Sequence, residues 1–167
     1  VSELDTENRR VRLTDGRAIS FDHLVLATGG RPRPLACPGA DHPRVHYLRT
    51  VTDVDRIRSQ FHPGTRLVLV GGGYIGLEIA AVAAELGLTV TVLEAQTTVL
   101  ARVTCPTVAR FFEHTHRRAG VTIRCATTVT RIHDSSSTAR IELDSGEYID
   151  ADLVIVGIGL LPNVDLA

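Results

Sequence analysis

Lysine, methionine and tryptophan are absent from this chain of 167 residues, and all 18 of its basic side chains are arginines. Without lysine, the chain cannot form a Schiff base with a carbonyl substrate or with pyridoxal phosphate. It also cannot complete a P-loop, in which a lysine reaches the β- and γ-phosphates, or a protein-kinase active site. The composition therefore excludes three common kinds of active site from this chain.

Charge and cysteine content exclude further classes. The 18 arginines are balanced by 19 acidic residues, so the formal net charge is -1, which argues against nucleic-acid or membrane-surface binding through bulk charge. The three cysteines, Cys37, Cys105 and Cys125, are widely separated and form no CxxC pair. This spacing excludes a zinc knuckle and a disulfide framework, and it indicates a reducing cytoplasm.

Signals for a membrane span and for a metal site are also missing. The chain has no run of about 18 apolar residues, so we expect no membrane-spanning helix. His114 and His116 stand two positions apart on an expected helix. They point to different faces of that helix and cannot chelate one metal ion together. We therefore predict solvated histidines and no metal site.

The first 43 residues predict a small β unit followed by a connector. Residues 11–21 alternate apolar and polar side chains around Asp15 and Gly16, which is typical of a β-hairpin. Residues 23–30 form a short apolar run that ends in two glycines, which predicts a strand buried on both faces. Four of the seven prolines lie in residues 31–43, so we expect an extended connector between domains there.

From residue 50 the pattern alternates between helix and buried strand. A helix should follow a cap at Thr50 or Thr52 and end before Pro63, and Pro106 and Gly120 delimit another over residues 106–119. The other expected elements are a helix over 77–86, buried strands over 67–70, 89–94, 121–125 and 153–156, and a three-stranded meander over 128–133, 139–143 and 147–149, with turns at 134–137 and 144–146. This order predicts an α/β fold, a Rossmann-like parallel sheet with right-handed βαβ crossovers and an added three-stranded β-meander.

The strongest chemical signal is a GxGxxG motif that follows one expected strand and opens the next helix. Its residues are Gly71, Gly72, Gly73, Tyr74, Ile75 and Gly76. In a dinucleotide-binding turn the first glycine makes the tight turn, the second lets the backbone approach the pyrophosphate, and the third allows close packing of helix on strand. The helix N-terminus then binds the phosphates. The alternative is a tight turn that needs glycine for steric reasons alone.

An acidic residue completes this fingerprint. Glu94 ends the next expected strand, 23 residues after Gly71, where a carboxylate can accept hydrogen bonds from the ribose hydroxyls of adenosine. The same carboxylate repels a 2′-phosphate, and the next arginine in the chain is Arg102. The sequence therefore favours NADH over NADPH, and Gln96 is a second candidate for a ribose contact.

Two residues near the start of the same helix are candidates for the nicotinamide end. Glu78 could contact the nicotinamide carboxamide, and Tyr74 could gate or stack on a ring. An ordinary surface glutamate and a packing tyrosine explain the same residues equally well, and both interpretations stay open.

Three motifs stand in a familiar order along the chain. They are LATGGRPR at residues 26–33, VGGGYIGLE at 70–78 and VGIGLLPN at 156–163. This arrangement resembles the flavoprotein reductases that have two dinucleotide-binding domains, in particular the NADH-dependent ferredoxin reductases of the putidaredoxin reductase type. Residues 100–106, LARVTCP, resemble the same subgroup.

The resemblance implies that the chain is an interior fragment. Members of the family begin with a separate FAD-binding glycine motif and continue, after the Pro-Asn motif, into the rest of the FAD domain and a small interface domain. Residues 1–36 would then be the C-terminal strip of the FAD domain, 37–158 the NADH-binding domain, and 159–167 the start of the return segment. The cofactor contacts that the resemblance implies are Ala27, Thr28, Gly29 and Arg33 on the FAD side, and Glu78, Gly157, Ile158 and Gly159 beside nicotinamide.

The implied function is hydride transfer from NADH to FAD, followed by electron transfer to a [2Fe–2S] ferredoxin that serves a cytochrome P450 or a dioxygenase in the bacterial cytoplasm. No catalytic acid or base is required of this chain, and we expect the fragment alone to be inactive and to hold no FAD tightly. Two alternatives stay open. One is another NADH-dependent flavoprotein of the superfamily, of the NADH oxidase, rubredoxin reductase or nitrite reductase type. The other is a nucleotide-binding module without redox chemistry.

Overall fold

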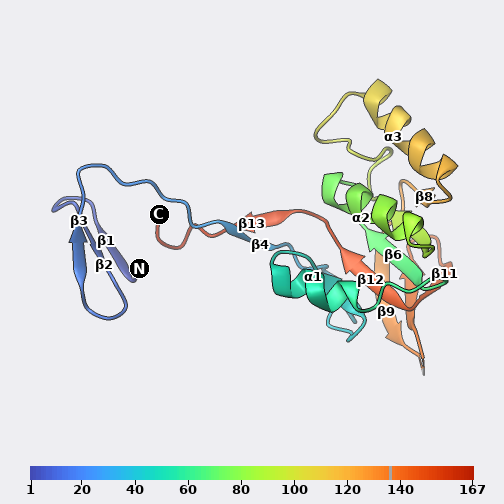
Figure 1. Cartoon of the computed structure of the whole chain (residues 1–167), viewed down its shortest axis with the longest axis horizontal. Helices are drawn as coiled ribbons and strands as arrows, with labels where there is room; N and C mark the ends of the chain where they lie inside the picture. Colours follow the sequence, from blue (N-terminus) through green and yellow to red (C-terminus); the bar gives the residue numbers. More distant parts are fainter. Residues whose placement is uncertain (136) are drawn as a thin grey trace. The chain divides into compact units, whose positions relative to one another are not determined.

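The computed structural model describes residues 1–135 and 137–167 and divides them into two compact units. One unit contains Val1–Arg31 and Leu160–Ala167, and the other contains Pro32–Gly159 (Figure 1). We describe each unit by itself. The larger unit carries the GxGxxG motif and is the one that positions the candidate site.

A parallel sheet forms the centre of the larger unit, as the sequence predicts, and it has five strands. Its strands stand in the order β5-β12-β6-β7-β8. Their bounds are β5 (Val45–Tyr47), β6 (Arg66–Val70), β7 (Thr89–Leu93), β8 (Thr122–Arg124) and β12 (Leu153–Val156). Strand β12 is buried along its whole length and β6 at four of its five residues, because both faces of the sheet are covered. Strand β5 was not expected from the sequence.

The helices begin at residues that local chemistry explains. Helix α1 (Val51–Arg58) follows a capping box in which Thr50 and Asp53 satisfy each other's backbone N–H groups. Helix α3 (Pro106–Arg118) has proline in its first turn, where no N–H is needed. None of the helices in residues 1–135 and 137–167 has the length and apolar character that crossing a membrane requires.

Helix α2 (Tyr74–Glu85) begins three residues before the predicted start at residue 77. The prediction treated Gly76 as part of the turn, but this glycine lies inside the first helical turn and is buried. A Cβ at Gly76 would stand 2.2 Å from the carbonyl oxygen of Gly71. Gly76 therefore allows the first turn of α2 to pack closely on the glycine turn, and the helix continues through it.

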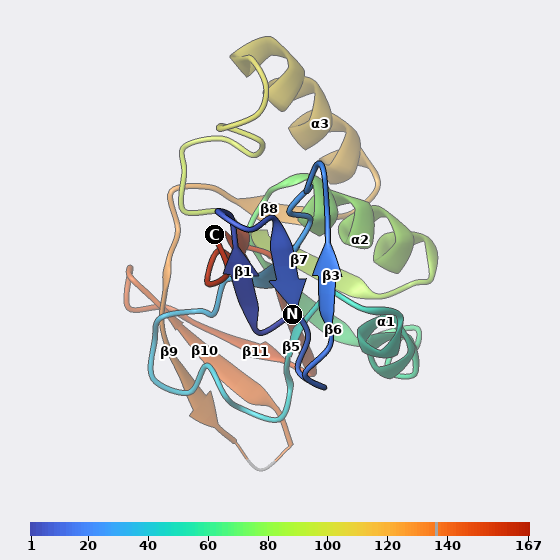
Figure 2. The same cartoon turned by 90° about the vertical axis from the view of Figure 1, so that its left-hand side faces the viewer.

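The three-stranded meander is confirmed and covers the face of the sheet opposite to the helices (Figure 2). Its strands are β9 (Val129–Asp134), β10 (Ala139–Leu143) and β11 (Tyr148–Ala151), in the order β11-β10-β9. Apolar side chains of the meander pack on Val68, Val70, Val154 and Val156 of the sheet. Within the predicted turn over 134–137, Ser136 lies outside the described residues.

The smaller unit contains the predicted hairpin but not the predicted buried strand. Strands β1 (Glu3–Asp5), β2 (Arg10–Arg12) and β3 (Ala18–Ser20) form one antiparallel sheet, and β4 (Gly30–Pro32) pairs with β13 (Leu160–Pro162). The strand expected over residues 23–30 is wrong. Val25 is 86% exposed, and no described strand pairs with residues 24–28. An apolar strand needs neighbouring strands that bond its backbone and cover its faces, and the described chain places no such strand beside residues 24–28.

The proline-rich segment over residues 31–43 is less extended than expected, because it packs on the meander. The carbonyl oxygen of Pro38 accepts a hydrogen bond from the N–H of Ile132 at 2.9 Å, and Leu35 and Cys37 contact the apolar core beneath the meander. A Cβ at Gly39 would overlap the carbonyl group of Ile132. Within the larger unit, the segment therefore lies against the meander, close to the candidate site.

The prediction that His116 is solvated is also wrong. Its ring is buried between α3 and α2, with Nδ1 2.9 Å from the carbonyl oxygen of Phe112 and Nε2 3.0 Å from that of Leu77. Packing of α3 on α2 decides this, because it turns one face of α3 inward. His116 therefore joins the two helices.

Candidate nucleotide-binding site

The glycine turn lies at the carboxyl edge of the parallel sheet, between β6 and α2. The N–H of Gly71 donates to the carbonyl oxygen of Leu93, and the N–H of Gly157 donates to that of Val70, each at 2.8 Å. Gly71 has a φ of +112°, and a Cβ there would stand 2.5 Å from the carbonyl oxygen of Gly157. Glycine is therefore required at the first position for both conformation and space. These contacts bring residues 157 and 158 to the GxGxxG turn, as the prediction of a shared site needs.

The second glycine of the motif leaves open space. Gly73 is the N-cap of α2, and no side chain caps the helix there. A Cβ at Gly73 would have no other atom within 4 Å. A helix N-terminus has backbone N–H groups without intrahelical partners and a partial positive charge, which together favour a phosphate. The turn thus combines open space with uncapped donors.

The carboxylate of Glu94 is bound to the glycine turn. Its Oε2 accepts a hydrogen bond from the N–H of Gly72 at 2.6 Å, and its Oε1 accepts one from the N–H of Gln96 at 2.8 Å. The parallel register, which pairs Val70 with Leu93, places the glycine turn and Glu94 at the same edge of the sheet. Each carboxylate oxygen has a further lone pair with which to accept a hydrogen bond, so ribose hydroxyls could also bind here.

A cavity of about 370 Å³ opens beside these residues. It is lined by six of the predicted residues, namely Gly71, Gly73, Glu94, Gln96, Gly157 and Ile158. Its remaining walls are Leu35, Ala36, Val70, Leu93, Ala95, Arg102, Thr127, Thr128 and Val129. Ligands of open parallel sheets bind outside the carboxyl ends of the strands, and this cavity has that position.

Sequence reasoning missed the wall formed by residues 127–129. They follow β8, and they are held by two backbone bonds, from the N–H of Ala126 to the carbonyl oxygen of Gln96 at 2.7 Å and from the N–H of Thr127 to that of Glu94 at 3.0 Å. Their place after the carboxyl end of a parallel strand was a signal that could have found them. No local signal marks Leu35 and Ala36.

Two arginines stand at the edge of the site, beside Gly159. A Cβ at Gly159, whose φ is +115°, would lie 3.9 Å from Nε of Arg33 and 4.0 Å from a terminal nitrogen of Arg102. Arg102 also lines a smaller cavity of about 70 Å³ together with Gly72, Tyr74 and Glu94. The structure places the guanidinium of Arg33 beside Gly159 in the larger unit, and the flavin contact that the resemblance implies for Arg33 stays a prediction.

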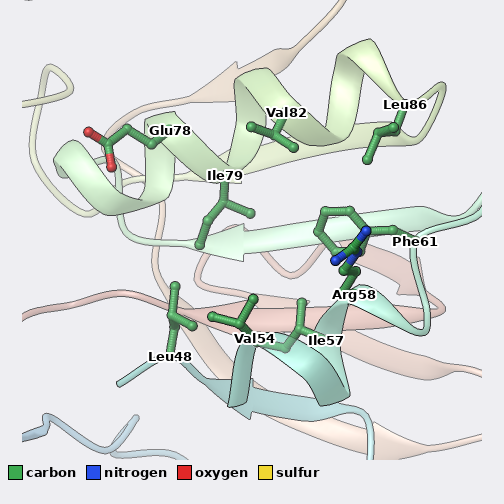
Figure 3. A pocket seen from close by; sticks show the side chains of 9 residues that line it. All are labelled: Leu48, Val54, Ile57, Arg58, Phe61, Glu78, Ile79, Val82 and Leu86. Atoms are coloured by element: carbon green, nitrogen blue, oxygen red, sulfur yellow. The ribbon is translucent and has the colours of Figure 1, made fainter. Parts of the chain in front are cut away.

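Glu78 does not line the cavity that contains Glu94. It lies at one end of a separate, apolar groove of about 320 Å³ between α1 and α2 (Figure 3). The other lining residues are Leu48, Val54, Ile57, Arg58, Phe61, Ile79, Val82 and Leu86. Tyr74 and Ile75 are about half exposed at the start of α2. The nicotinamide contacts of Glu78 and Tyr74 stay predictions.

The flavin-side motif lies in the smaller unit, next to the Pro-Asn motif. The hydroxyl of Thr28 donates to the carbonyl oxygen of Asn163 at 2.5 Å, and the side-chain amide of Asn163 donates to the carbonyl oxygen of Thr28 at 2.9 Å. Ala27, Thr28 and Gly29 are exposed, so their backbone is accessible to a ligand. Their role toward FAD stays a prediction.

A half-buried thiol, that of Cys125, lies directly after β8. The Sγ of Cys125 donates to Oε1 of Glu113 at 3.6 Å, and the same oxygen accepts the N–H of Val99. Burial raises the pKa of Cys125 to about 11, and the negative charge of Glu113 adds to this effect. Cys125 is therefore a neutral packing residue, unsuited to nucleophilic chemistry beside the site.

Comparisons with known proteins agree with this geometry. The family model described as pyridine nucleotide-disulphide oxidoreductase matches residues 1–167. Putidaredoxin reductase CamA of Pseudomonas putida is 46% identical over 173 residues, which is 100% of this chain and 41% of that protein. The ferredoxin–NAD(+) reductase component of the p-cumate 2,3-dioxygenase system of Pseudomonas putida is 40% identical and is matched over 40% of its length by 99% of this chain.

A solved structure supports the same relationship. The structure of the covalent complex between putidaredoxin reductase and putidaredoxin has a TM-score of 0.89 and 45% sequence identity over 99% of this chain and 41% of that one. The chain thus spans about two fifths of the length of the proteins it matches.

Proposed function

Because the chain belongs to the pyridine nucleotide-disulphide oxidoreductase family, we propose that it is the NADH-binding portion of an FAD-dependent ferredoxin reductase. One observation carries the nucleotide assignment: the carboxylate of Glu94 is bound to the N–H of Gly72 at the open edge of the sheet. The two parts of the dinucleotide fingerprint, the glycine turn and the acidic residue at the end of the next strand, therefore lie side by side. The reductase assignment is supported by the two relatives, which are named as a putidaredoxin reductase and as a ferredoxin–NAD(+) reductase component.

NADH would lie across the glycine turn. Its diphosphate would take the uncapped N–H groups at the start of α2, next to the open side of Gly73. The hydroxyls of the adenosine ribose would donate hydrogen bonds to Glu94, and the ribose would also contact Gln96. The adenine would bind in the cavity that residues 127–129 line. A 2′-phosphate would meet the Glu94 carboxylate at close range, so NADH is favoured over NADPH.

The nicotinamide end would lie toward Gly157, Ile158 and Gly159, with Glu78 at the start of α2 as a candidate partner of the carboxamide. The flavin, bound by the complete protein, supplies an acceptor for hydride and a donor of single electrons. In this chain Ala27, Thr28 and Gly29 would lie along it. The task of these residues is to hold and orient the two ligands, because no proton has to be moved by a side chain.

The partner would be a [2Fe–2S] ferredoxin that feeds a cytochrome P450 or a dioxygenase. The name of one relative, the ferredoxin–NAD(+) reductase component of a dioxygenase system, supports a ferredoxin and a dioxygenase. We also propose the division into a strip of the FAD domain at residues 1–36, the NADH domain at 37–158 and a return segment at 159–167. The chain alone would bind NADH and be inactive as a reductase.

Isothermal titration of the purified chain with NADH, NADPH and FAD tests this function. We expect NADH to bind more tightly than NADPH and the purified chain to be colourless. A yellow, FAD-loaded chain would contradict the assignment of the flavin site to other parts of the protein. Equal affinity for NADH and NADPH would contradict the role of Glu94, and absence of NADH binding would overturn the proposed function.

A further inference from the structure

Helix α2 has two apolar faces, and the parallel sheet covers one of them. Leu77 and Ala80 are buried in the core that α2 forms with the sheet. A second set, Ile79, Val82 and Leu86, recurs at helical spacing and lines the groove between α1 and α2 (Figure 3). A helix that is apolar on both sides is typical of a buried position, so we expect this second face to be covered as well.

The walls of the groove are apolar and half exposed. Seven of its nine lining residues are apolar. Val54 on α1 is 45% exposed, and Val82 and Leu86 on the opposite wall are 52% and 51% exposed. Contiguous exposed apolar surface marks an interaction site in a folded protein. Within residues 1–135 and 137–167, these three side chains keep an uncovered side, and the groove is therefore open to a partner.

A charged side chain stands at the end of the groove away from Glu78. Arg58 lines the groove together with Phe61 (Figure 3), and it forms no ion pair in the described part of the chain. A carboxylate that reaches it forms a charge-assisted bond next to apolar surface, where salt screens the attraction less. The occupant should therefore carry an acidic residue at this end. Glu78, at the other end, is left to the nucleotide.

The chemistry of the groove favours an occupant from the same polypeptide. Permanent interfaces are more apolar than transient ones, and electron-transfer partners meet over small areas, so the groove does not suit a ferredoxin that binds and leaves. Putidaredoxin reductase CamA matches the whole of this chain at 46% identity, and about three fifths of its length lies outside the match. A complete protein of that size contains enough further chain to cover the groove permanently.

We propose that a segment of the complete reductase outside these 167 residues packs in the groove as an amphipathic helix. Its apolar stripe contacts Val54, Val82 and Leu86, and a carboxylate on it pairs with Arg58. The stretch from Ile79 to Leu86 is about 10 Å long, which two turns of a helix cover with apolar residues three, four and seven positions apart. This inference rests on the proposed function, because the longer reductase provides the segment.

The test is the rate at which a maleimide labels single introduced thiols in the 167-residue chain and in the complete reductase. Val82→Cys and Leu86→Cys report the groove, and Arg110→Cys on α3, at an exposed position, is the matched control. Digestion and mass spectrometry separate each site from the three native cysteines. In the complete reductase both groove thiols should react roughly 10-fold more slowly than the control. In the chain alone all three should react at similar rates, because all three positions are exposed there.

Equal rates at the three positions of the complete reductase would overturn the proposal. Slow groove thiols in the chain alone, with a rate that falls as the chain concentration rises, would assign the groove to a second copy and also overturn it. Slow labelling only after ferredoxin is added would assign the groove to that partner, with the same consequence. NADH titration of the same samples tests the proposed function separately. A complete protein that protects the groove but binds no NADH would overturn that function and leave the covered groove standing.

The carboxylate is tested by removing its expected partner. Arg58→Gln in the complete reductase should raise the labelling rate of the Leu86→Cys thiol several-fold, because loss of the ion pair weakens the contact. Arg56→Gln, in the same last turn of α1, is the matched control and should leave the rate unchanged. Equal rates in the two variants would overturn the ion pair at Arg58.

Discussion

The carboxylate of Glu94 accepts a hydrogen bond from the backbone N–H of Gly72 at 2.6 Å, across the gap between the ends of β6 and β7. The second oxygen of the same carboxylate accepts the N–H of Gln96. Glu94 therefore orders the glycine turn and the loop after β7 in addition to offering lone pairs to a ribose. Its substitution should affect both the ligand and the turn.

We expect Glu94→Ala to weaken NADH binding by roughly 10- to 100-fold, because it removes a charge-assisted acceptor for ribose and releases the N–H of Gly72. NADPH should be affected less, since the repulsion of its 2′-phosphate is also removed. The ratio of the two dissociation constants, measured by titration, reports the change. Glu85→Ala, at the exposed end of α2, serves as control, and an unchanged ratio in Glu94→Ala would exclude the assigned role.

Two glycines of one motif should fail in different ways. In Gly73→Ala the new Cβ meets no atom within 4 Å, so we expect a loss of stability under about 1 kcal/mol but loss of NADH affinity, because the methyl group occupies the approach of the diphosphate. In Gly76→Ala the Cβ would stand 2.2 Å from the carbonyl oxygen of Gly71, which should lower the free energy of unfolding by about 1–3 kcal/mol. Urea unfolding and NADH titration separate the two effects. Similar stability losses in both variants would contradict this distinction.

The three cysteines should react in a defined order. Backbone N–H groups at the start of α3, first that of Val108, lower the pKa of the exposed Cys105 thiol, whereas burial raises the pKa of Cys37 and raises that of Cys125 to about 11. Iodoacetamide at neutral pH should therefore modify Cys105 first and Cys125 last. Mass spectrometry of digested samples gives the order, and the chain unfolded in urea should lose it. Early labelling of Cys125 in the folded chain would show that its environment is different.

The pair of Asp152 with Arg66 should stabilise the fold in a limited pH range. The guanidinium of Arg66 holds the carboxylate with two bonds, at 3.0 and 2.8 Å, and lowers the pKa of Asp152 from its ordinary value of 3.8 to about 2. Because the pKa of Asp152 is lower in the folded state than in the unfolded state, the pair stabilises the folded state at pH values above the unfolded-state pKa. This stabilisation is lost as the pH falls from about 4 to about 2. Because both side chains are partly exposed, we expect the pair to contribute only about 1 kcal/mol to the free energy of unfolding.

Asp152→Asn should therefore be less stable than the parent chain at pH 6, and the difference in the free energy of unfolding should vanish near pH 2. Urea unfolding at several pH values measures it. Asp165→Asn, at an exposed position of the smaller unit, is the control. A difference that does not change with pH would assign the effect to packing alone.

Much of the fold followed from signals between residues close in sequence. The capping residue Thr50, the first-turn Pro106 and the strand over residues 153–156 lie as predicted. Buried strands that alternate with helices predicted the parallel sheet, and short strands separated by polar turns predicted the meander. The strand predicted over residues 23–30 failed for a reason of the same kind. An apolar run indicates that the segment needs neighbouring strands to cover it, but it does not indicate whether those strands belong to this chain.

The candidate site divides in the same way. The sequence by itself determined the glycine turn and Glu94, because the spacing of one βαβ unit places them at one sheet edge whatever else the chain does. Tertiary structure alone decided the burial of His116, the place of Leu35 and Ala36 in the cavity wall and the convergence of Arg33 with Arg102 at Gly159. These contacts depend on how elements distant in the sequence pack on each other; Leu77 and His116 are 39 positions apart, and Arg33 and Gly159 are 126 positions apart. No local propensity encodes such contacts, because burial and charge pairing are properties of the assembled layers.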